Sequence, residues 1–271
     1  GPVAELVALD SFDGKAAENA RRAAADDAAL AYLGDFASND VQQSAPILGA
    51  SGLLAVAPVA TFAGLEGPTL VRLTPHDGVG AEAIADWLVE RDVGDLLVVH
   101  DHDDGYGVPV GRMCADAARE RGIAVRSQPV WDETPTAVAA EALLYVGVAG
   151  SGAVALWRDL HLLDPAMWLL GSEGVAADWL ARELEPPAAE RTRFFVAPRG
   201  PWGFYGYEAM ALILDAIAQA GDRAGVVALA RGTRDRDSIF GRYSIDADGH
   251  TTSTAYGRLA VVDGELVWDR G

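Results

Sequence analysis

The residues most suited to chemistry lie in the run HDHDDGYG at 100–107, which contains His100, His102, Asp103 and Asp104 and follows the apolar stretch DLLVV. Imidazole and carboxylate groups at the carboxyl end of a buried strand are suited to a divalent metal ion. Alternate residues of a loop need not converge, however, and no His-x-x-x-His pair accompanies them. A solvated turn with acidic residues near a helix N-terminus explains the run better, and we predict no metal and no cofactor.

Signatures of other catalytic classes are also absent from the sequence. No glycine run has the G-x-G-x-x-G, P-loop or G-x-S-x-G spacing, and the histidines form no triad pattern with Ser51 or Ser172. DADGH at 246–250 resembles a calcium loop but lacks the downstream glutamate. The only cysteine, Cys114, lies in a helical pattern typical of a buried thiol. We therefore predict that the protein is not an enzyme.

Composition and charge limit the possible partners. The chain has 271 residues, of which 50% are hydrophobic, so it is not a disordered chain. With 21 basic and 40 acidic residues, its formal net charge is −19. Because nucleic acids and anionic membranes attract basic surfaces, this charge disfavours both as partners.

The elements that must position any site alternate between strand and helix patterns. Strands are predicted at 4–10, 29–34, 53–58, 69–75, 95–101, 125–131, 143–148, 167–172, 193–198 and 257–268. Helices are predicted at 15–27, 40–50, 80–92, 108–121, 151–162, 175–184, 205–220 and 222–231. This alternation predicts an α/β fold with parallel sheets, and Asp263-Gly264 predicts a type I′ hairpin within the last strand pair.

Ligands of open α/β sheets bind beyond the carboxyl ends of the strands. After the strand at 29–34, Ser38 and Asn39 precede a helix predicted to start near Asp40. A hydroxyl and free backbone N–H groups at a helix N-terminus can hold a carboxylate, although Ser38 could equally be a simple helix cap. After the strand at 53–58, the segment Val59, Ala60 and Thr61 offers backbone groups and one hydroxyl.

The later strands add aromatic and acidic residues. Tyr106 follows the strand at 95–101, and Tyr145 lies on the strand at 143–148. Glu173 follows the strand at 167–172, where it could pair with an ammonium group. Each residue has an ordinary surface or core explanation, but together they would supply a carboxylate site, an ammonium partner and aromatic walls.

These segments also carry a resemblance to a known family. The chain resembles the branched-chain amino-acid type of ABC-transporter solute-binding proteins in GDFASNDVQQSAPILGASGLLAVAPVAT, VRLTPHDGVGAEAIADWLVER, DLLVVHDHDDGYG, LLGSEGV, YGYEAMALILDAI and GRYSIDADG. These segments run in family order across nearly the whole chain. The resemblance implies two doubly wound parallel-sheet lobes joined by three crossovers, the type I periplasmic-binding-protein fold, with a ligand held between the lobes.

Carried over to this sequence, the resemblance assigns roles to the same residues. Ser38 and the backbone of 59–61 resemble positions that hold a ligand carboxylate, whereas Thr61 and Glu173 resemble those that hold the ammonium. Tyr106, and with less agreement Tyr145, resemble the aromatic wall of the second lobe.

The resemblance also implies a domain division and one departure. The first lobe is expected at 1–73 and again at 197–241, and the second at 74–196 and 242–271. Family members place a strand, a glycine-rich loop and a long helix before the segment that matches AELVALDSFDG. No such segment precedes it in this sequence.

The predicted function is that of a solute-binding protein of an ABC importer that captures a small polar solute, with an amino acid as the expected class. The resemblance implies a permease as partner, a monomeric state and a periplasmic or cell-surface location, although no signal-peptide pattern opens the sequence at GPVAEL. The alternatives are a ligand-sensing domain of a receptor or regulator, and a metal-dependent α/β enzyme that uses the His100–Asp104 run.

Overall fold

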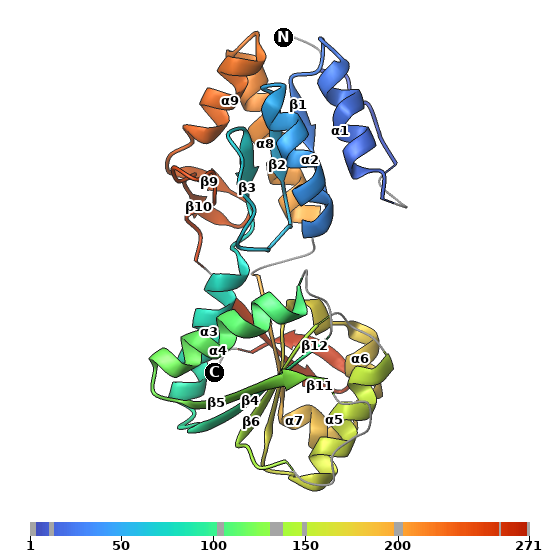
Figure 1. Ribbon diagram of the computed structural model, residues 1–271, viewed down its shortest axis with the longest axis vertical. Coiled ribbons are helices and arrows are strands. Elements are labelled where there is room, and N and C mark those ends of the chain that lie inside the picture. The colour runs from blue at the N-terminus through green and yellow to red at the C-terminus, as the bar shows by residue number, and fades with distance from the viewer. Residues whose placement is uncertain are drawn as a thin grey trace. The chain divides into compact units, whose positions relative to one another are not determined.

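We describe a computed structural model of the chain (Figure 1). It describes residues 4–10, 14–101, 106–130, 138–147, 151–197, 203–254 and 256–269. The chain forms two compact units. Unit 1 contains Gly1–His76 and Arg199–Thr254, and unit 2 contains Asp77–Pro198 and Ala255–Gly271.

Unit 1 is built on a short parallel sheet with strand order β1-β2-β3. Its strands are β1 (Ala31–Leu33), β2 (Leu54–Ala57) and β3 (Leu70–Arg72), with a separate antiparallel pair, β9 (Arg236–Ser238) and β10 (Gly241–Tyr243). Its helices are α1 (Ala16–Ala25), α2 (Ser38–Ala50), α8 (Gly203–Gln219) and α9 (Arg223–Arg231).

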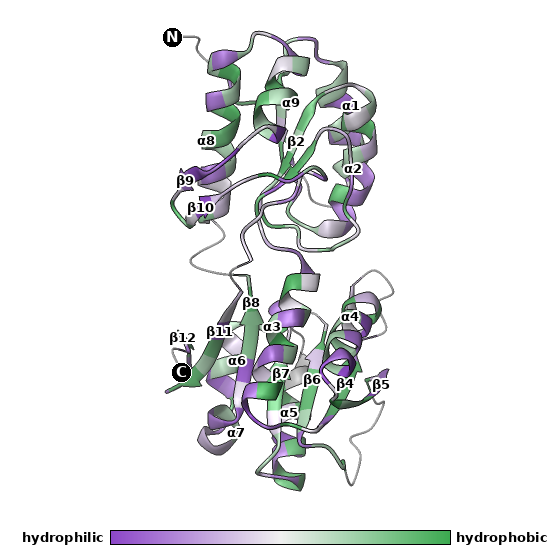
Figure 2. Cartoon of the chain, turned by 90° about the vertical axis from the view of Figure 1, so that its left-hand side faces the viewer, coloured by the Kyte–Doolittle hydropathy of each residue, from purple (hydrophilic) through white to green (hydrophobic). Residues whose placement is uncertain are grey.

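Helices cover both faces of this sheet. Figure 2 shows α8 and α9 on one side of β2 and α1 and α2 on the other. Alternate residues of β2 point to opposite faces of the sheet. Leu54 and Val56 pack with α8 and α9, whereas Ala55 and Ala57 pack with α1 and α2. This period-two alternation is the packing expected of a strand buried on both faces.

Unit 2 has a seven-stranded sheet with the order β12-β11-β8-β7-β6-β4-β5. Its strands are β4 (Asp95–His100), β5 (Ala124–Pro129), β6 (Ala142–Val146), β7 (Trp168–Gly171), β8 (Thr192–Val196), β11 (Gly257–Val262) and β12 (Glu265–Trp268). Its helices are α3 (Asp77–Glu90), α4 (Gly107–Glu120), α5 (Ser151–Leu163), the 3₁₀ turn η1 (Glu173–Val175), α6 (Asp178–Glu183) and α7 (Pro186–Glu190).

The sheet of unit 2 separates two hydrophobic cores. Leu96, Val98 and Leu144 pack with α3 and α4 on one face. Leu97 and Leu143 pack with α5, α6 and α7 on the other. Hydrophobic residues accordingly run along the central strands in Figure 2. The α/β class with parallel sheets, predicted from the alternating pattern, is confirmed.

The end of the chain forms the predicted hairpin. β11 pairs with β12 in antiparallel register, with Val262 opposite Glu265. Asp263 and Gly264 between them have φ values of 51° and 78°, as a type I′ turn requires. Because β11 also pairs antiparallel with β8, this hairpin ends an otherwise parallel sheet.

The prediction of a strand at 4–10 is wrong. The structure shows no strand there, and Leu6 and Val7 remain 75% and 55% exposed. Alternation of apolar residues is not sufficient for a strand, because its backbone groups also need a partner strand. Among the described residues, β1 pairs only with β2, so its other edge is open.

The sequence patterns also missed three short elements, α7, β9 and β10. Each has five residues or fewer, too few for a periodic pattern to be distinguished from a loop.

The chain passes between the units at 76–77, 198–199 and 254–255. The sequence predicts these passages near 73, 196 and 241. The last lies later because Tyr243 and Ile245 are buried in the α8–α9 core of unit 1. No helix in the described part of the chain is both long and apolar enough to span a membrane.

Candidate ligand-binding site

Polar side chains of unit 2 converge at the carboxyl edge of its parallel strands. Glu173 follows β7, Tyr106 follows β4, and Tyr256 immediately precedes the antiparallel β11, so that it reaches the same edge. Asp77 enters from the first turn of α3. We call this region the Glu173 pocket; its lining residues are Asp77, Gly80, Ala81, Ile84, Tyr106, Val110, Cys114, Ser172, Glu173, Phe195 and Tyr256.

The Glu173 carboxylate is held through one of its two oxygens. Its Oε2 accepts hydrogen bonds from the backbone N–H of Ala197 at 3.2 Å and from the hydroxyl of Tyr256 at 3.1 Å. Its Oε1 is fully buried and has no hydrogen-bond partner among the described residues. A buried carboxylate oxygen without a donor is costly unless a ligand or water supplies one.

The electrostatics of the pocket are strongly acidic. Burial, together with the nearby Asp77 carboxylate, raises the pKa of Glu173 to about 7, although the hydrogen bonds from Ala197 and Tyr256 lower it. Burial and neighbouring carboxylates also raise the pKa of the Tyr106 and Tyr256 hydroxyls. None of the described lining residues carries a positive charge. The pocket therefore has the field of a cation site.

Two glycines make room for the aromatic side chains. A Cβ on Gly80 would lie 2.6 Å from Cζ of Tyr256. A Cβ on Gly174 would lie 2.3 Å from the carbonyl oxygen of Gly147 and 3.1 Å from Cε1 of Tyr106. Both tyrosine rings thus occupy space that only glycine leaves free.

The pocket is small and closed on one side by a thiol. Its cavity is about 10 Å³, room for about one water molecule. Cys114 is 1% exposed, and burial raises the pKa of its thiol to about 12. The prediction that this thiol is buried is confirmed.

The predicted residues of unit 1 also come together. Ser38 is the first residue of α2, and its Oγ accepts a hydrogen bond from the backbone N–H of Phe62 at 3.2 Å. This bond ties α2 to the loop that follows β2, in which Val59, Ala60 and Thr61 are buried. The guanidinium of Arg72, which is fully buried, donates to the carbonyl of Phe62. Unit 1 therefore places a buried positive charge beside this loop.

The start of α2 differs from the prediction. The helix begins at Ser38 rather than near Asp40, so Ser38 and Asn39 lie in its first turn. Ser38 does not cap the helix, because its hydroxyl faces Phe62 instead. Asn39 is exposed, and its carbonyl accepts a bond from Gln43.

Tyr145 lies outside the Glu173 pocket. Its ring packs edge-on against Trp157 at a centroid distance of 5.7 Å, within the core formed with α5. Of the histidine–aspartate run, positions 102–105 lie outside the described residues. Within the described part of the chain, no group of three or more His, Cys, Asp or Glu side chains could hold a metal ion.

Sequence reasoning missed Asp77 and Tyr256. Asp77 was not predicted as a helix residue, because α3 begins at Asp77, three residues before the predicted start at Gly80. Tyr256 precedes a strand, whereas the rule for ligand sites of α/β sheets predicts residues that follow the carboxyl ends of strands. The only signal for Tyr256 was its place before the predicted hairpin.

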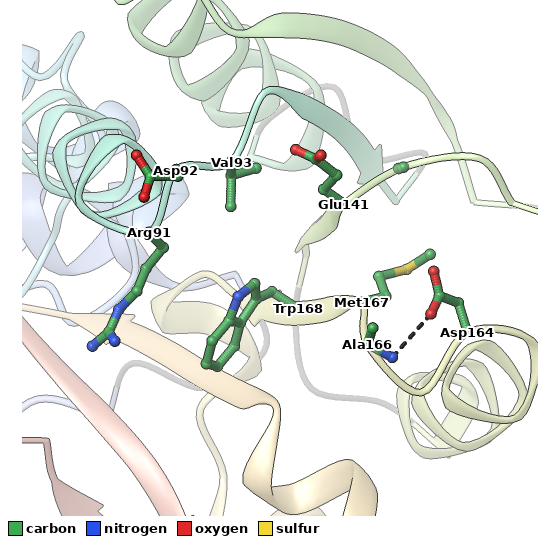
Figure 3. A pocket seen from close by; sticks show the side chains of 9 residues that line it. Arg91, Asp92, Val93, Glu141, Asp164, Ala166, Met167 and Trp168 are labelled. Carbon is green, nitrogen blue, oxygen red and sulfur yellow. Dashed lines mark hydrogen bonds between the residues drawn. The ribbon is translucent and has the colours of Figure 1, made fainter.

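A larger cavity of about 260 Å³ lies elsewhere in unit 2, at the amino ends of β4, β6 and β7. Figure 3 shows Arg91 beside Trp168, with Glu141 across the opening. The guanidinium carbon of Arg91 lies 5.9 Å from the Trp168 ring centroid. None of the predicted site residues lines this cavity, whereas Tyr106 and Glu173 line the smaller one. We therefore take the smaller Glu173 pocket, and not the larger cavity, as the candidate site.

No protein-family model matches the chain, and no curated protein matches its sequence. Its structure is similar to a leucine-binding protein from Thermotoga maritima, with 22% identity over 98% of this chain and 86% of that chain and a TM-score of 0.81. An ABC transporter substrate-binding protein from Desulfitobacterium hafniense in complex with Leu shows 18% identity over 96% and 87%, with a TM-score of 0.80.

A third similar structure binds a ligand without an ammonium group. It is a solute-binding protein of an ABC transporter from Rhodopseudomonas palustris HaA2 in complex with p-hydroxybenzoic acid, with 15% identity over 97% of this chain and 83% of that chain and a TM-score of 0.75. The chain therefore has the type I periplasmic-binding-protein fold. At these identities the comparisons establish the fold, and the site must indicate the ligand.

Proposed function

We propose that this protein is a non-catalytic solute-binding protein of an ABC importer that captures an amino acid. The observation that carries the proposal is the Glu173 pocket. Its buried carboxylate keeps Oε1 without a partner, and Asp77 adds a second acidic group. A protonated amine would supply both the missing hydrogen-bond donor and the missing positive charge.

Unit 1 carries groups suited to the carboxylate of an amino acid. The loop at 59–61 carries backbone groups and the Thr61 hydroxyl, and buried Arg72 lies beside it. Hydrogen-bond donors near a buried positive charge favour a carboxylate. In the proposed function, unit 1 binds the carboxylate of the amino acid and unit 2 binds its ammonium group.

The acidic pocket also favours an amino acid over an aromatic acid. Benzoates carry a carboxylate and no ammonium, so the Glu173 pocket would repel their charge without gaining a counter-ion. Of the two ligand classes bound by similar structures, leucine therefore suits this pocket better than p-hydroxybenzoate.

The remaining parts of the proposal follow the similar structures. One of them is described as an extracellular ligand-binding receptor from Rhodopseudomonas palustris HaA2. We propose the same side of the membrane for this protein, as a monomer that delivers its ligand to a permease.

Calorimetric titration with leucine, isoleucine and p-hydroxybenzoate tests the proposal. We expect the amino acids to bind and Glu173→Gln to weaken their binding by about 100-fold, because the variant keeps the shape but removes the charge that pairs with the ammonium. Binding of p-hydroxybenzoate alone, or amino-acid binding unchanged by Glu173→Gln, would contradict it.

A further inference from the structure

Tyr256 stands out in the Glu173 pocket because it is the only side chain that donates a hydrogen bond to Glu173 within the described structure. The other donor is a backbone N–H, which no substitution of a side chain removes. The two donors come from different strands, Ala197 after β8 and Tyr256 before β11. Both donate to Oε2, and Oε1 is buried without a hydrogen-bond partner among the described residues.

The fold makes specific room for this contact. The Tyr256 ring lies directly over α3 at Gly80, where a Cβ would approach Cζ to 2.6 Å and the hydroxyl oxygen to 2.8 Å. Because any larger residue would displace the ring, the position of the hydroxyl depends on this glycine. The Tyr256 ring therefore packs closely against α3 at Gly80.

We propose that Tyr256 is a positioning residue, whose hydroxyl holds the Glu173 carboxylate with Oε1 directed at the ligand and thereby sets the preference of the site for a protonated nitrogen. This inference rests on the proposed function. It goes beyond it by assigning the selectivity to a residue that does not itself carry the charge.

The surroundings explain why one hydroxyl has such an effect. Four titratable groups line the pocket with Glu173. Asp77 lies in α3 and Cys114 in α4, whereas Tyr106 immediately precedes α4 and Tyr256 immediately precedes β11. Burial opposes the charge of Glu173 most strongly, and the Asp77 carboxylate opposes it further. Without the Tyr256 hydroxyl, the carboxylate keeps only the Ala197 N–H as a donor among the described residues, so it takes up a proton more readily and loses its attraction for an ammonium.

The test compares Tyr256→Phe with Tyr243→Phe. Tyr243 donates its hydroxyl to the buried carboxylate of Glu208 at 2.9 Å in unit 1, so the control removes the same type of bond away from the Glu173 pocket. The probes are leucine and 4-methylpentanoate, its analogue without nitrogen, titrated by calorimetry from pH 5 to pH 9. The Glu173 carboxyl is titrated separately, without ligand, by NMR of protein labelled at the glutamate carboxyl carbon, with Glu173→Gln identifying its signal.

We expect Tyr256→Phe to weaken leucine binding about tenfold at pH 7 and to change binding of the analogue much less. The NMR midpoint of Glu173 should lie near pH 7 in the wild type and at higher pH in Tyr256→Phe. Tyr243→Phe should change neither quantity.

The inference would be overturned if Tyr256→Phe left both the NMR midpoint and the ratio of leucine to analogue binding unchanged. An equal loss for both ligands would also overturn it, because that result indicates general damage to the pocket. If the wild-type protein bound no amino acid, the proposed function would fail, while the ligand-free titration would still decide whether Tyr256 controls Glu173.

Discussion

The two units bury charges of opposite sign near their candidate ligand residues. Unit 1 buries the guanidinium of Arg72 beside the loop that contains Thr61. Unit 2 buries Glu173 and Asp77 and has no positive charge among the described residues of the pocket. The type I fold alone does not require this division, since similar structures bind ligands with and without an ammonium group. Under the proposed function, the ligand class would depend on a few buried ionic groups placed on a common scaffold.

The sheets of the two units differ as well. Unit 2 has a seven-stranded sheet in which β6 pairs on both sides, with β4 and with β7. Unit 1 has three strands, and its edge strand β1 pairs on one side within the described part of the chain. The acidic pocket is therefore built on the more extensively paired scaffold.

Hydrogen exchange should show the largest contrast between the units. We expect the amides of Ala142–Val146 in β6 to exchange roughly 100-fold or more slowly than those of Ala31–Leu33 in β1, because opening β6 breaks two ladders. Mass spectrometry or NMR measures both segments in one sample. Equal protection would show that another element covers the β1 edge.

The buried acid of unit 2 should make stability depend on pH. Because folding raises the pKa of Glu173 from 4.5 to about 7, the stability that it contributes is fully present below pH 4.5 and is lost as the pH rises to about 7. Glu173→Gln should therefore stabilise the protein by about 3 kcal/mol above pH 7 and have little effect near pH 4.

Denaturant unfolding at pH 4, 6 and 8 measures this effect. The matched control is Glu66→Gln, which makes the same change at an exposed position of unit 1. A pH-independent effect of Glu173→Gln, or the same pH dependence in the control, would contradict burial of the charged form as its cause.

The smallest effect is expected at Ser38, whose side chain is uncharged. Ser38→Ala removes the acceptor for the Phe62 N–H and loosens the loop that follows β2. We expect leucine binding to weaken by about 1 kcal/mol, roughly fivefold. Calorimetry should show no such loss for Ser51→Ala, at the other end of α2, where the hydroxyl donates to the Leu48 carbonyl at 2.8 Å. An unchanged affinity in Ser38→Ala would place the ligand away from this loop.

Much of the fold could be predicted because each long element carries its own periodic signal. The apolar run DLLVVH forms the buried strand β4, and Asp263-Gly264 sets the turn of the last hairpin. The strand expected at 4–10 failed because the pattern of a strand is local, whereas its pairing is not. The passage near residue 254 was misplaced for a similar reason, since the burial of Ile245 depends on α8 and α9.

The site could be predicted in part. Reading the carboxyl ends of strands found Tyr106 and Glu173, which line one pocket, and Ser38, which reaches the loop after β2. It could not find Tyr256, because an antiparallel strand brings its amino end to that edge. It also could not show that Tyr145 turns toward Trp157, since the direction of a side chain depends on register.

Cys114 gives the protein a built-in chemical reporter. The chain has one cysteine, and its thiol lies buried in the wall of the Glu173 pocket. A thiol-modifying reagent can therefore label each molecule once, and only after that wall has opened. The labelling rate therefore reports how often unit 2 opens. A bound ligand that holds Glu173 in place would lower this rate, so occupancy of the ligand site can be followed without an attached dye or an engineered mutation.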